Sequence, residues 1–328
     1  MKHQLLDSDY YIAYSISDAK AVVTNYTDES VDNTVVIIAN YTGNKLNDVY
    51  YEEKTLLPGK NEVVAENLSQ ELGTVTKVMV WNSLSSIKPI CDTLSTKITP
   101  KIRIAGDSIS AKWPMERYGQ QGWGEPFKDE WTDDVVVLND AVSGWTTEKY
   151  YNEKWAGIKA EMNPGDYLLV SYLHNDYYVP LKDTTQADYI NTYRGYLEKL
   201  IKETKEIGVN IVLVVPPNRG VQGNFHGDFS FVMPALAAEY NVPCIDVHAK
   251  TIEMLDSDLE GTKQLLYMYK LVEQGIISQT QLETHSNETF RKNGEDLTHL
   301  STQGAAWVAD YVATELAKVI PGLASFRK

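Results

Sequence analysis

Residues 104–110 (IAGDSIS) place a serine, Ser108, directly after an apolar run that is typical of a buried strand. At the carboxyl end of such a strand, near a helix start, backbone N–H groups favour the negative charge that develops when a serine attacks a carbonyl group. Gly106 permits the tight turn that would lift Ser108 out of the strand. The alternative is a helix cap made by Asp107 or Ser108, and Gly-Asp-Ser alone fits that simpler interpretation better.

An aspartate and a histidine that could serve such a serine lie in residues 295–304 (EDLTHLSTQG). Asp296 precedes His299 by three residues, so its carboxylate can fold back and accept a hydrogen bond from the imidazole Nδ1–H. That bond would fix the tautomer of His299 and leave Nε2 free to take the serine proton. The alternative is a polar loop in which Ser301 or Thr302 caps the last helix, and the spacing alone favours that alternative.

Two further residues have donor groups that could bind an oxyanion. Asn175 follows an apolar run in residues 172–176 (YLHND), and its side-chain amide is a hydrogen-bond donor. Gly144 follows another apolar run in residues 139–145 (NDAVSGW), and its N–H can approach a ligand because no Cβ blocks it. Each is also an ordinary turn residue, so neither is specific alone.

The composition is that of a globular protein, and the charge excludes two classes of partner. The chain has 328 residues, of which 43% are hydrophobic and 23% are charged, with a formal net charge of −15. This charge repels nucleic acid and anionic membranes, so we expect neither as a partner. No apolar run is long enough to span a membrane, and the first ten residues lack the apolar run of a signal peptide.

Cysteine and histidine usage indicates no disulfide framework and no metal site. Cys91 and Cys244 fall in what we predict to be different domains, so we expect two buried free thiols rather than a bridge. His226, His248 and His285 show no zinc-ligand spacing, and no glycine-rich phosphate loop follows a strand. We therefore expect no metal and no other cofactor.

Residues 1–98 are predicted to form an antiparallel β-sandwich. Short β-branched and aromatic runs recur with no helical pattern between them, and turn residues such as Pro58-Gly59-Lys60 separate them. The polar stretch at residues 92–100 ends in a proline and is predicted to be a linker. The expected strands are residues 21–26, 34–41, 46–53, 61–66 and 76–83.

Residues 99–328 are predicted to form a three-layer α/β domain with a mainly parallel sheet. Continuous apolar runs, as in strands covered on both faces, alternate with helical patterns. Helices are expected at residues 188–208, ended by Gly208, and at residues 305–320. In such a sheet the chemistry lies beyond the carboxyl ends of the strands. The expected strands are residues 101–106, 135–139, 166–173, 210–216 and 242–247.

Together, the candidate residues indicate a catalytic site more specifically than any one of them does alone. All of them follow strands of this domain or precede its last helix, in the order Ser, Gly, Asn, Asp-x-x-His. In this combination the chain resembles the SGNH (GDSL) hydrolases, and most closely the rhamnogalacturonan acetylesterases and related pectin or xylan acetylesterases. The resemblance implies a flavodoxin-like fold and a serine ester hydrolase. The matching strings, which span residues 105–305, are AGDSISAK at 105–112, GWGE at 122–125, LNDAVSG at 138–144, HND at 174–176 and DLTHLSTQGA at 296–305.

The resemblance also implies a role for each matching residue. Ser108 is expected to be the nucleophile and His299 the base, with Asp296 orienting the imidazole. The N–H groups of Ser108 and Gly144 and the amide of Asn175 are expected to form the oxyanion hole. The family is named for Ser, Gly, Asn and His in four sequence blocks, of which the second contains Gly144 here and the third is residues 173–176. The third block departs from the family pattern, because Leu173 stands where glycine is usual. We expect that leucine to affect the acyl pocket.

For substrate, the resemblance implies an acetylated polysaccharide, namely pectin, rhamnogalacturonan or xylan, and hence an extracellular location. Trp145 and His174 adjoin oxyanion-hole residues and are our candidates for substrate contact. The other aromatic residues near the motifs are Trp113, Trp123, Tyr177 and Tyr178, and about half of this aromatic group is expected to be core. The alternatives are an SGNH lipase or acyltransferase acting on other acyl esters, or a non-catalytic glycan-binding protein on the same scaffold.

Overall fold

The computed structural model describes residues 2–5, 9–15, 19–42, 44–68, 72–178 and 185–328. The chain divides into two compact units, Met1–Thr99 and Pro100–Lys328, here called the N-terminal unit and the C-terminal unit. The candidate catalytic residues all lie in the C-terminal unit.

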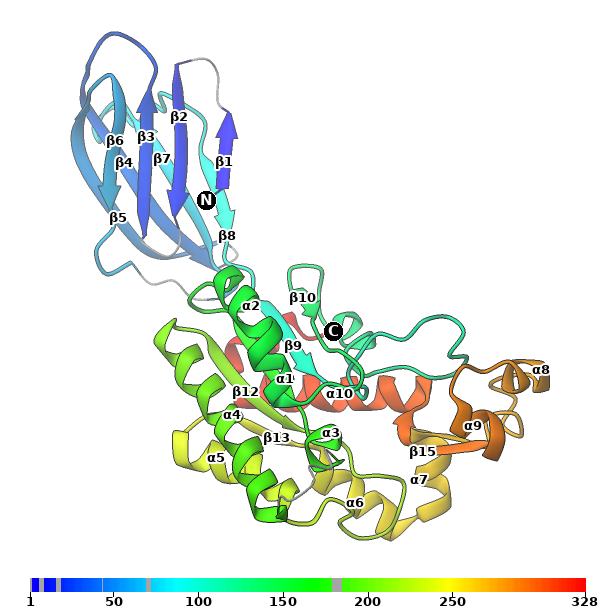
Figure 1. Ribbon diagram of the computed structural model, residues 1–328. Helices are drawn as coiled ribbons and strands as arrows, with labels where there is room; N and C mark the ends of the chain where they lie inside the picture. The colour runs from blue at the N-terminus through cyan, green and yellow to red at the C-terminus, as the bar shows by residue number, and fades with distance from the viewer. Residues whose placement is uncertain (1, 6–8, 16–18, 43, 69–71, 179–184) are drawn as a thin grey trace. The chain divides into compact units, whose positions relative to one another are not determined.

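The N-terminal unit contains two four-stranded antiparallel sheets (Figure 1). One sheet has the order β1-β2-β3-β6 and the other β5-β4-β7-β8. All five strands expected from the sequence are present. The strands are β1 (Lys2–Leu5), β2 (Tyr10–Ser15), β3 (Lys20–Asn25), β4 (Val31–Thr42), β5 (Lys45–Leu56), β6 (Gly59–Val64), β7 (Val75–Trp81) and β8 (Leu94–Lys97).

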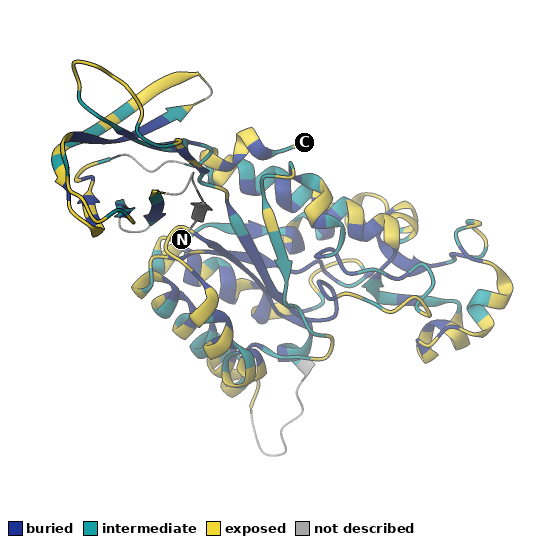
Figure 2. Cartoon of the chain, turned by 90° about the horizontal axis from the view of Figure 1, so that it is seen from above, coloured by how far each residue is buried: buried dark blue, intermediate teal, exposed yellow. Residues whose placement is uncertain are grey.

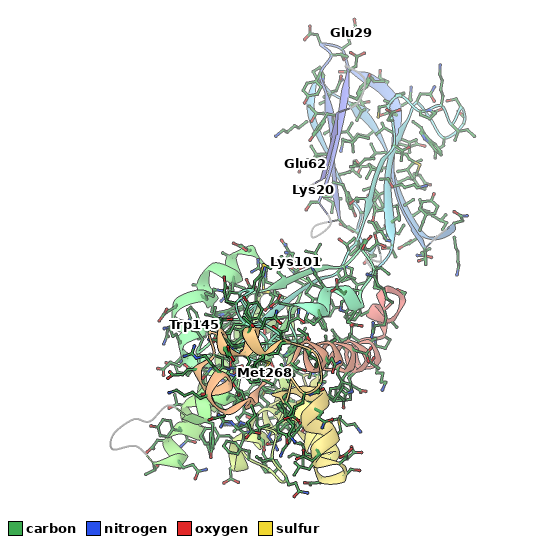
Figure 3. The ribbon with its side chains drawn as sticks, turned by 90° about the vertical axis from the view of Figure 1, so that its right-hand side faces the viewer. Lys20, Glu29, Glu62, Lys101, Trp145 and Met268 are labelled. Carbon is green, nitrogen blue, oxygen red and sulfur yellow. The ribbon has the colours of Figure 1, made fainter. Side chains whose placement is uncertain are left out.

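Both sheets contribute to one hydrophobic cluster, which includes Ile12 and Val23 from the first sheet and Ile38 and Val80 from the second. Burial alternates along β3, β6 and β7, as expected for strands with one face on a core. On the outer face of the first sheet, Lys20 on β3 forms an ion pair with Glu62 on β6 at 3.5 Å (Figure 3).

The predicted linker at residues 92–100 is partly wrong. Leu94–Lys97 is the strand β8, which pairs with β7 in the register Val78↔Leu94 to Val75↔Lys97. Leu94 and Thr96 are buried, so the stretch alternates buried and exposed positions. The polar composition concealed a short edge strand.

The C-terminal unit is built on a five-stranded parallel sheet with the order β10-β9-β11-β12-β13. Numbered along the chain, this is the order 2-1-3-4-5 of flavodoxin-like folds, whose switch point lies between the first and third strands. The five expected strands are confirmed. They are β9 (Lys101–Gly106), β10 (Val136–Asn139), β11 (Tyr167–Ser171), β12 (Asn210–Val215) and β13 (Cys244–Asp246).

Helices cover both faces of this sheet (Figure 1). On one face, α4 (Gln186–Glu206) and α5 (Val232–Tyr240) pack against β12 and each other. On the other, α6 (Val247–Ser257) and α7 (Leu259–Leu266) contact α10 (Thr302–Val319). Figure 2 shows the buried strands between helices whose outer faces are exposed. The shorter helices are η1 (Pro126–Glu130), α1 (Thr147–Tyr150), the π-helix η2 (Tyr151–Trp155), α2 (Ala156–Glu161), α3 (His174–Tyr178), η3 (Gly227–Phe231), α8 (Gln279–Glu283), α9 (Glu288–Asn293) and η4 (Pro321–Phe326).

Both helices expected from the sequence are confirmed, with caps that explain their ends. Thr185 and Asp188 form a capping box at the start of α4, and Gly208 follows its end with φ +71°. Ser301 caps α10 by accepting a hydrogen bond from the Gly304 N–H at 2.9 Å.

A two-stranded antiparallel sheet, β14 (Tyr267–Tyr269) with β15 (Glu295–Leu300), leads into α10. Its register shifts abruptly, because Tyr267 pairs with Leu300 whereas Met268 pairs with Asp296. The residues between Asp296 and Leu300 therefore bulge out of the ladder.

Neither cysteine forms a disulfide. Cys91 lies in the N-terminal unit and Cys244 on β13, and both are free. They are half-buried rather than buried, which corrects one part of the prediction. Burial raises the pKa of Cys91 to about 11 and that of Cys244 to about 12, so both thiols are protonated at neutral pH.

Candidate active site

Ser108 lies just beyond the carboxyl end of β9, as predicted, at the edge of the sheet near the switch point. It is 7% exposed. No helix begins here, contrary to our expectation: residues 107–111 form a tight turn in which the Ser110 N–H donates to the Asp107 carbonyl at 3.1 Å. Gly106 is required by close packing, since a Cβ there would lie 2.9 Å from the Ser171 carbonyl of the neighbouring strand.

Asp107, next to the serine, is fully buried and connects the serine turn to the third block. Its Oδ1 accepts a hydrogen bond from the Ile109 N–H at 3.0 Å. Burial raises the pKa of Asp107 to about 6, and the N–H groups of Ile109, Leu173 and His174 partly offset that rise.

Asp296 and His299 form the predicted pair, with His299 Nδ1 and Asp296 Oδ2 2.7 Å apart. Asp296 Oδ1 accepts hydrogen bonds from the N–H groups of Thr298 at 2.9 Å and His299 at 3.2 Å. The bulge in β15 supplies this geometry, because it releases residues 297–299 from the ladder. The imidazole side chain is 22% exposed, so its other nitrogen can reach a substrate.

Asn287 completes the environment of this carboxylate. Its Nδ2 donates to Asp296 Oδ2 at 2.6 Å. Burial would raise the pKa of Asp296, but the hydrogen bonds from His299, Asn287 and the Thr298 N–H outweigh it and hold the pKa well below the usual range. Asp296 is therefore ionised wherever the protein is folded, as a residue that orients an imidazole must be.

Trp113 brings the serine and the histidine together. Its Nε1 donates to the Ser108 carbonyl at 3.1 Å, and its ring makes an edge contact with the His299 ring at 5.5 Å between centroids. Glu125, from the GWGE string, accepts a hydrogen bond from the Trp113 N–H at 2.8 Å. Arg117 stacks on the indole at 4.7 Å. The predicted nucleophile and base thus share one indole as a neighbour.

Gly144 follows β10 and is exposed, with φ +80°. A Cβ there would meet nothing within 4 Å, so the left-handed backbone requires glycine, whereas crowding does not. The next residue, Trp145, is half-buried and packs against the hydrophobic core. The ammonium groups of Lys149 and Lys154 lie 5.2 and 5.8 Å from the centroid of its ring.

Asn175 lies on α3, and its amide connects the second and third blocks. Asn175 Nδ2 donates to the Trp145 carbonyl at 3.1 Å. The adjacent Asp176 accepts from the Thr147 N–H with both oxygens, at 3.1 and 3.2 Å. Burial raises the pKa of Asp176 to about 8, so its carboxyl group is mostly protonated at neutral pH.

Two residues of the third block lie differently from our expectation. His174, predicted to contact substrate, is 3% exposed, and both of its ring nitrogens bond within the protein. Leu173 is fully buried in the hydrophobic core, so its side chain does not line an open acyl pocket. Leu173, His174 and Asp176 are all buried, whereas Asn175 between them is half-buried.

The remaining aromatic residues that the structure describes pack in the core. Trp123 is fully buried and makes an edge contact with Phe127. Tyr177 packs against the core cluster and the ring of His226. The side chain of Tyr178 lies outside the described residues.

Residues 104–307 match the GDSL-like Lipase/Acylhydrolase family. The chain belongs to this family. It is a serine ester hydrolase, and its matched region contains all the site residues described above. Within the described part of the chain, no three histidine, cysteine, aspartate or glutamate side chains are grouped so as to hold a metal ion. Among the described helices, none is both long and apolar enough to cross a membrane.

The chain is also similar to individual proteins, one by sequence and two by structure. The rhamnogalacturonan acetylesterase RhgT of Bacillus subtilis (strain 168) is 29% identical over 221 residues, which are 65% of this chain and 88% of that protein. The crystal structure of protein YXIM from Bacillus subtilis superposes with a TM-score of 0.51 at 17% identity, covering 94% of this chain and 84% of that one. Axe2, an acetylxylan esterase from Geobacillus stearothermophilus, gives a TM-score of 0.40 at 19% identity, covering 49% and 83%.

Two contributors to this GDSL hydrolase site were missed by reasoning from the sequence. Asn287 caps α9 and reaches Asp296 across nine residues, without any motif spacing. Trp113 was predicted only as one of a general aromatic group, although it follows Ser108 by five residues and contacts both Ser108 and His299. Its position directly after the first matching string was the one available signal.

Proposed function

We propose that this GDSL hydrolase is an extracellular carbohydrate esterase that removes acetyl groups from plant cell-wall polysaccharide, either pectin or rhamnogalacturonan, or xylan. The observation that carries the proposal is the 2.7 Å bond between His299 and Asp296, with Trp113 in contact with both His299 and Ser108. The named activity of the Bacillus subtilis relative supports the substrate class.

In the proposed mechanism, Ser108 Oγ attacks the acetyl carbonyl carbon while His299 Nε2 takes the hydroxyl proton. The tetrahedral intermediate collapses, the bond to the sugar oxygen breaks, and His299 returns the proton to that oxygen. Water, activated by His299, then attacks the acetyl-serine and releases acetate. Asp296 stays ionised throughout and stabilises the imidazolium that forms in each half-reaction.

The negative charge that develops on the carbonyl oxygen is proposed to be held by the N–H groups of Ser108 and Gly144 and by the Asn175 amide. The Asn175 amide has two N–H groups, and one donates to the Trp145 carbonyl. That bond fixes the amide plane, which leaves the second N–H for the oxyanion. A donor fixed in advance needs no reorganisation during the reaction.

Trp145 is proposed to contact the sugar. Its half-buried ring offers an apolar surface beside Gly144, and the neighbouring ammonium groups of Lys149 and Lys154 add positive charge. Lys149 is also paired with Glu153 at 3.9 Å, so the apolar face of the indole is the feature that supports this role.

The N-terminal unit is proposed to be an accessory β-sandwich. Its two antiparallel sheets contribute to one hydrophobic cluster, which supports that architecture.

The test is acetate release from acetylated pectin and from acetylated xylan, with the wild type and Ser108→Ala side by side. Release by the wild type alone is expected, and the better polymer identifies the substrate. If neither polymer nor a small acetyl ester is cleaved, the acetylesterase proposal is wrong. Cleavage of only longer-chain esters would instead indicate a lipase of the same family.

A further inference from the structure

Three buried histidines from three separate segments form a continuous hydrogen-bonded chain behind the proposed oxyanion hole. His174 Nε2 lies 3.1 Å from the Pro217 carbonyl oxygen, and His174 Nδ1 lies 3.2 Å from His226 Nε2. His226 Nδ1 in turn lies 3.0 Å from His248 Nε2. The exposed fractions of His174, His226 and His248 are 3%, 0% and 2%.

The three imidazoles are neutral at pH 7. Burial lowers the pKa of His226 to about 3 and that of His248 to about 4, and it holds the pKa of His174 well below the ordinary value. The positive charge of Arg219 acts in the same direction on the pKa values of His174 and His226. Each ring therefore carries one N–H and one lone pair.

The Pro217 carbonyl determines the tautomer of all three rings. A carbonyl can only accept, so His174 must carry its hydrogen on Nε2 and accept at Nδ1. His226 must then donate from Nε2 and accept at Nδ1, and His248 must donate from Nε2. Any other set of neutral tautomers leaves at least one of the three contacts with no hydrogen, or with two hydrogens, between its atoms. A buried polar group that loses its hydrogen bond in this way costs free energy.

The loop that holds Pro217 and His226 also contacts the catalytic histidine's strand. Gly220 in this loop donates its N–H to the Leu297 carbonyl on β15 at 2.8 Å, between Asp296 and His299. The same loop is fastened to α6, where Thr251 Oγ1 accepts from the Asn218 N–H at 2.9 Å. The loop thus contacts both the oxyanion side and the acid–base side of the site.

The helix that carries Asn175 is too short to hold its own position. α3 has only five residues, His174–Tyr178, and Asn175 is the second of them. His174 and Asp176 are the buried polar side chains of this helix, and they bond respectively to His226 and the Pro217 carbonyl, and to the Thr147 N–H. We propose that His174, His226 and His248 are positioning residues: a one-way hydrogen-bond chain, anchored on the Pro217 carbonyl, that sets the place of Asn175 relative to His299. This inference rests on the proposed oxyanion role of Asn175.

The first experiment tests the tautomers directly. In protein labelled with nitrogen-15 at histidine, long-range proton–nitrogen correlation spectra distinguish Nε2–H rings, Nδ1–H rings and charged rings. At pH 7 we expect His174, His226 and His248 all to be Nε2–H, with each assignment made by single His→Gln variants. An Nδ1–H or charged ring at any of the three positions would overturn the proposal. Because no substrate is involved, this result is separate from success or failure of the proposed esterase.

The second experiment separates hydrogen bonding from packing at His226. His226→Gln keeps one donor and one acceptor, whereas His226→Leu keeps similar volume and loses both. With 4-nitrophenyl acetate, we expect kcat of His226→Leu to fall by about 10- to 100-fold with little change in KM, because misplacing a catalytic group by about 1 Å has effects of this size. His226→Gln should recover most of kcat.

Two controls make the kinetic result specific. Thr204→Val removes a buried hydroxyl that bonds only within α4, so it should lower stability and leave kcat unchanged. In an Asn175→Ala background, His226→Leu should cost no further activity, because the group it positions is already absent. Unchanged kcat in folded His226→Leu, or equal losses in the Leu and Gln variants, would overturn the proposal. If His226→Leu does not fold, the Gln variant and the tautomer spectra decide.

Discussion

The acid–base side and the oxyanion side of this site are held in place by different means. Asp296 and His299 are three residues apart, and their bond closes within the bulge of one short strand. Asn175 instead bonds to a carbonyl 30 residues away, and its neighbour His174 bonds to groups 43 and 52 residues away.

This difference separates a locally encoded pair from a donor that depends on the whole domain. The acid–base bond itself forms from a carboxylate, a spacing of three and a bulge, and its one further side-chain donor, Asn287, lies nine residues before Asp296. The oxyanion donor needs a short helix, a loop after β12 and α6 to be packed correctly at the same time. We therefore expect distant substitutions in the domain to disturb the oxyanion side first.

The largest effect should come from breaking the local pair. Asp296→Asn keeps an acceptor for the Thr298 and His299 N–H groups, so the fold is expected to persist. It cannot hold His299 in the required tautomer, so kcat should fall about 10⁴-fold. Steady-state kinetics with 4-nitrophenyl acetate measures this, with circular dichroism as the check on folding. A loss of less than tenfold would mean that Asp296 does not orient His299.

Removing the Asn175 amide, which is held by contacts distant in sequence, should lower kcat less than Asp296→Asn does. Asn175→Ala is expected to raise the barrier by about 2.7–4 kcal/mol, seen as a 10²- to 10³-fold loss of kcat with KM little changed. Asn175→Asp is a useful companion, since it keeps the size and replaces the donor with an acceptor. If Asn175→Ala retained full turnover, the amide would have no part in the oxyanion hole.

As the pH falls, the stability contributed by the buried histidines behind the oxyanion hole should be lost before the stability contributed by Asp296. The pKa values of His226 and His248 are lowered by burial, so below about pH 6.5 the unfolded chain binds more protons than the folded one, and stability falls as the pH falls. Asp296, whose pKa is lowered from 3.8, gives stability that is lost only below about pH 4.

Urea unfolding of the wild type and His226→Gln at pH 7 and pH 5 checks this sequence of events. Between these pH values the wild type should lose roughly 2 kcal/mol more stability than the variant. The comparison cancels the contributions of Asp107 and Asp176, whose raised pKa values act in the opposite direction. Equal losses would show that His226 is charged in the folded protein.

The smallest effect should come from the residue that joins the serine and the histidine. Trp113→Phe keeps a ring edge for His299 and removes the N–H that donates to the Ser108 carbonyl. One neutral hydrogen bond is worth about 0.5–1.5 kcal/mol, so kcat should fall by roughly two- to tenfold. Trp113→Leu also removes the ring contact, so its kcat should be lower than that of Trp113→Phe. Identical kinetics for the two variants would exclude a role for the ring contact.

Much of the architecture could be predicted from local patterns. The strands β9 to β13, the helices α4 and α10 and most of the N-terminal strands follow from apolar periodicity and from cap residues. The strands β1, β2 and β8 were not predicted. In β8, three of the four residues are polar and the strand is short, so its composition resembled that of a linker. The serine, the acid–base pair, Gly144 and Asn175 could be named because each follows a strand or precedes α10.

The sequence by itself determined where the five parallel strands lie along the chain, which carboxylate pairs with His299, and that the chain belongs to a hydrolase family. Only the tertiary structure decided which side chains complete the site. His174 was expected at the substrate and lies buried in a chain with His226 and His248, while Trp113 and Asn287 became neighbours of the catalytic groups. The physical reason is that periodicity reports which face of an element is buried, whereas hydrogen-bond partners distant in sequence are set by how elements pack.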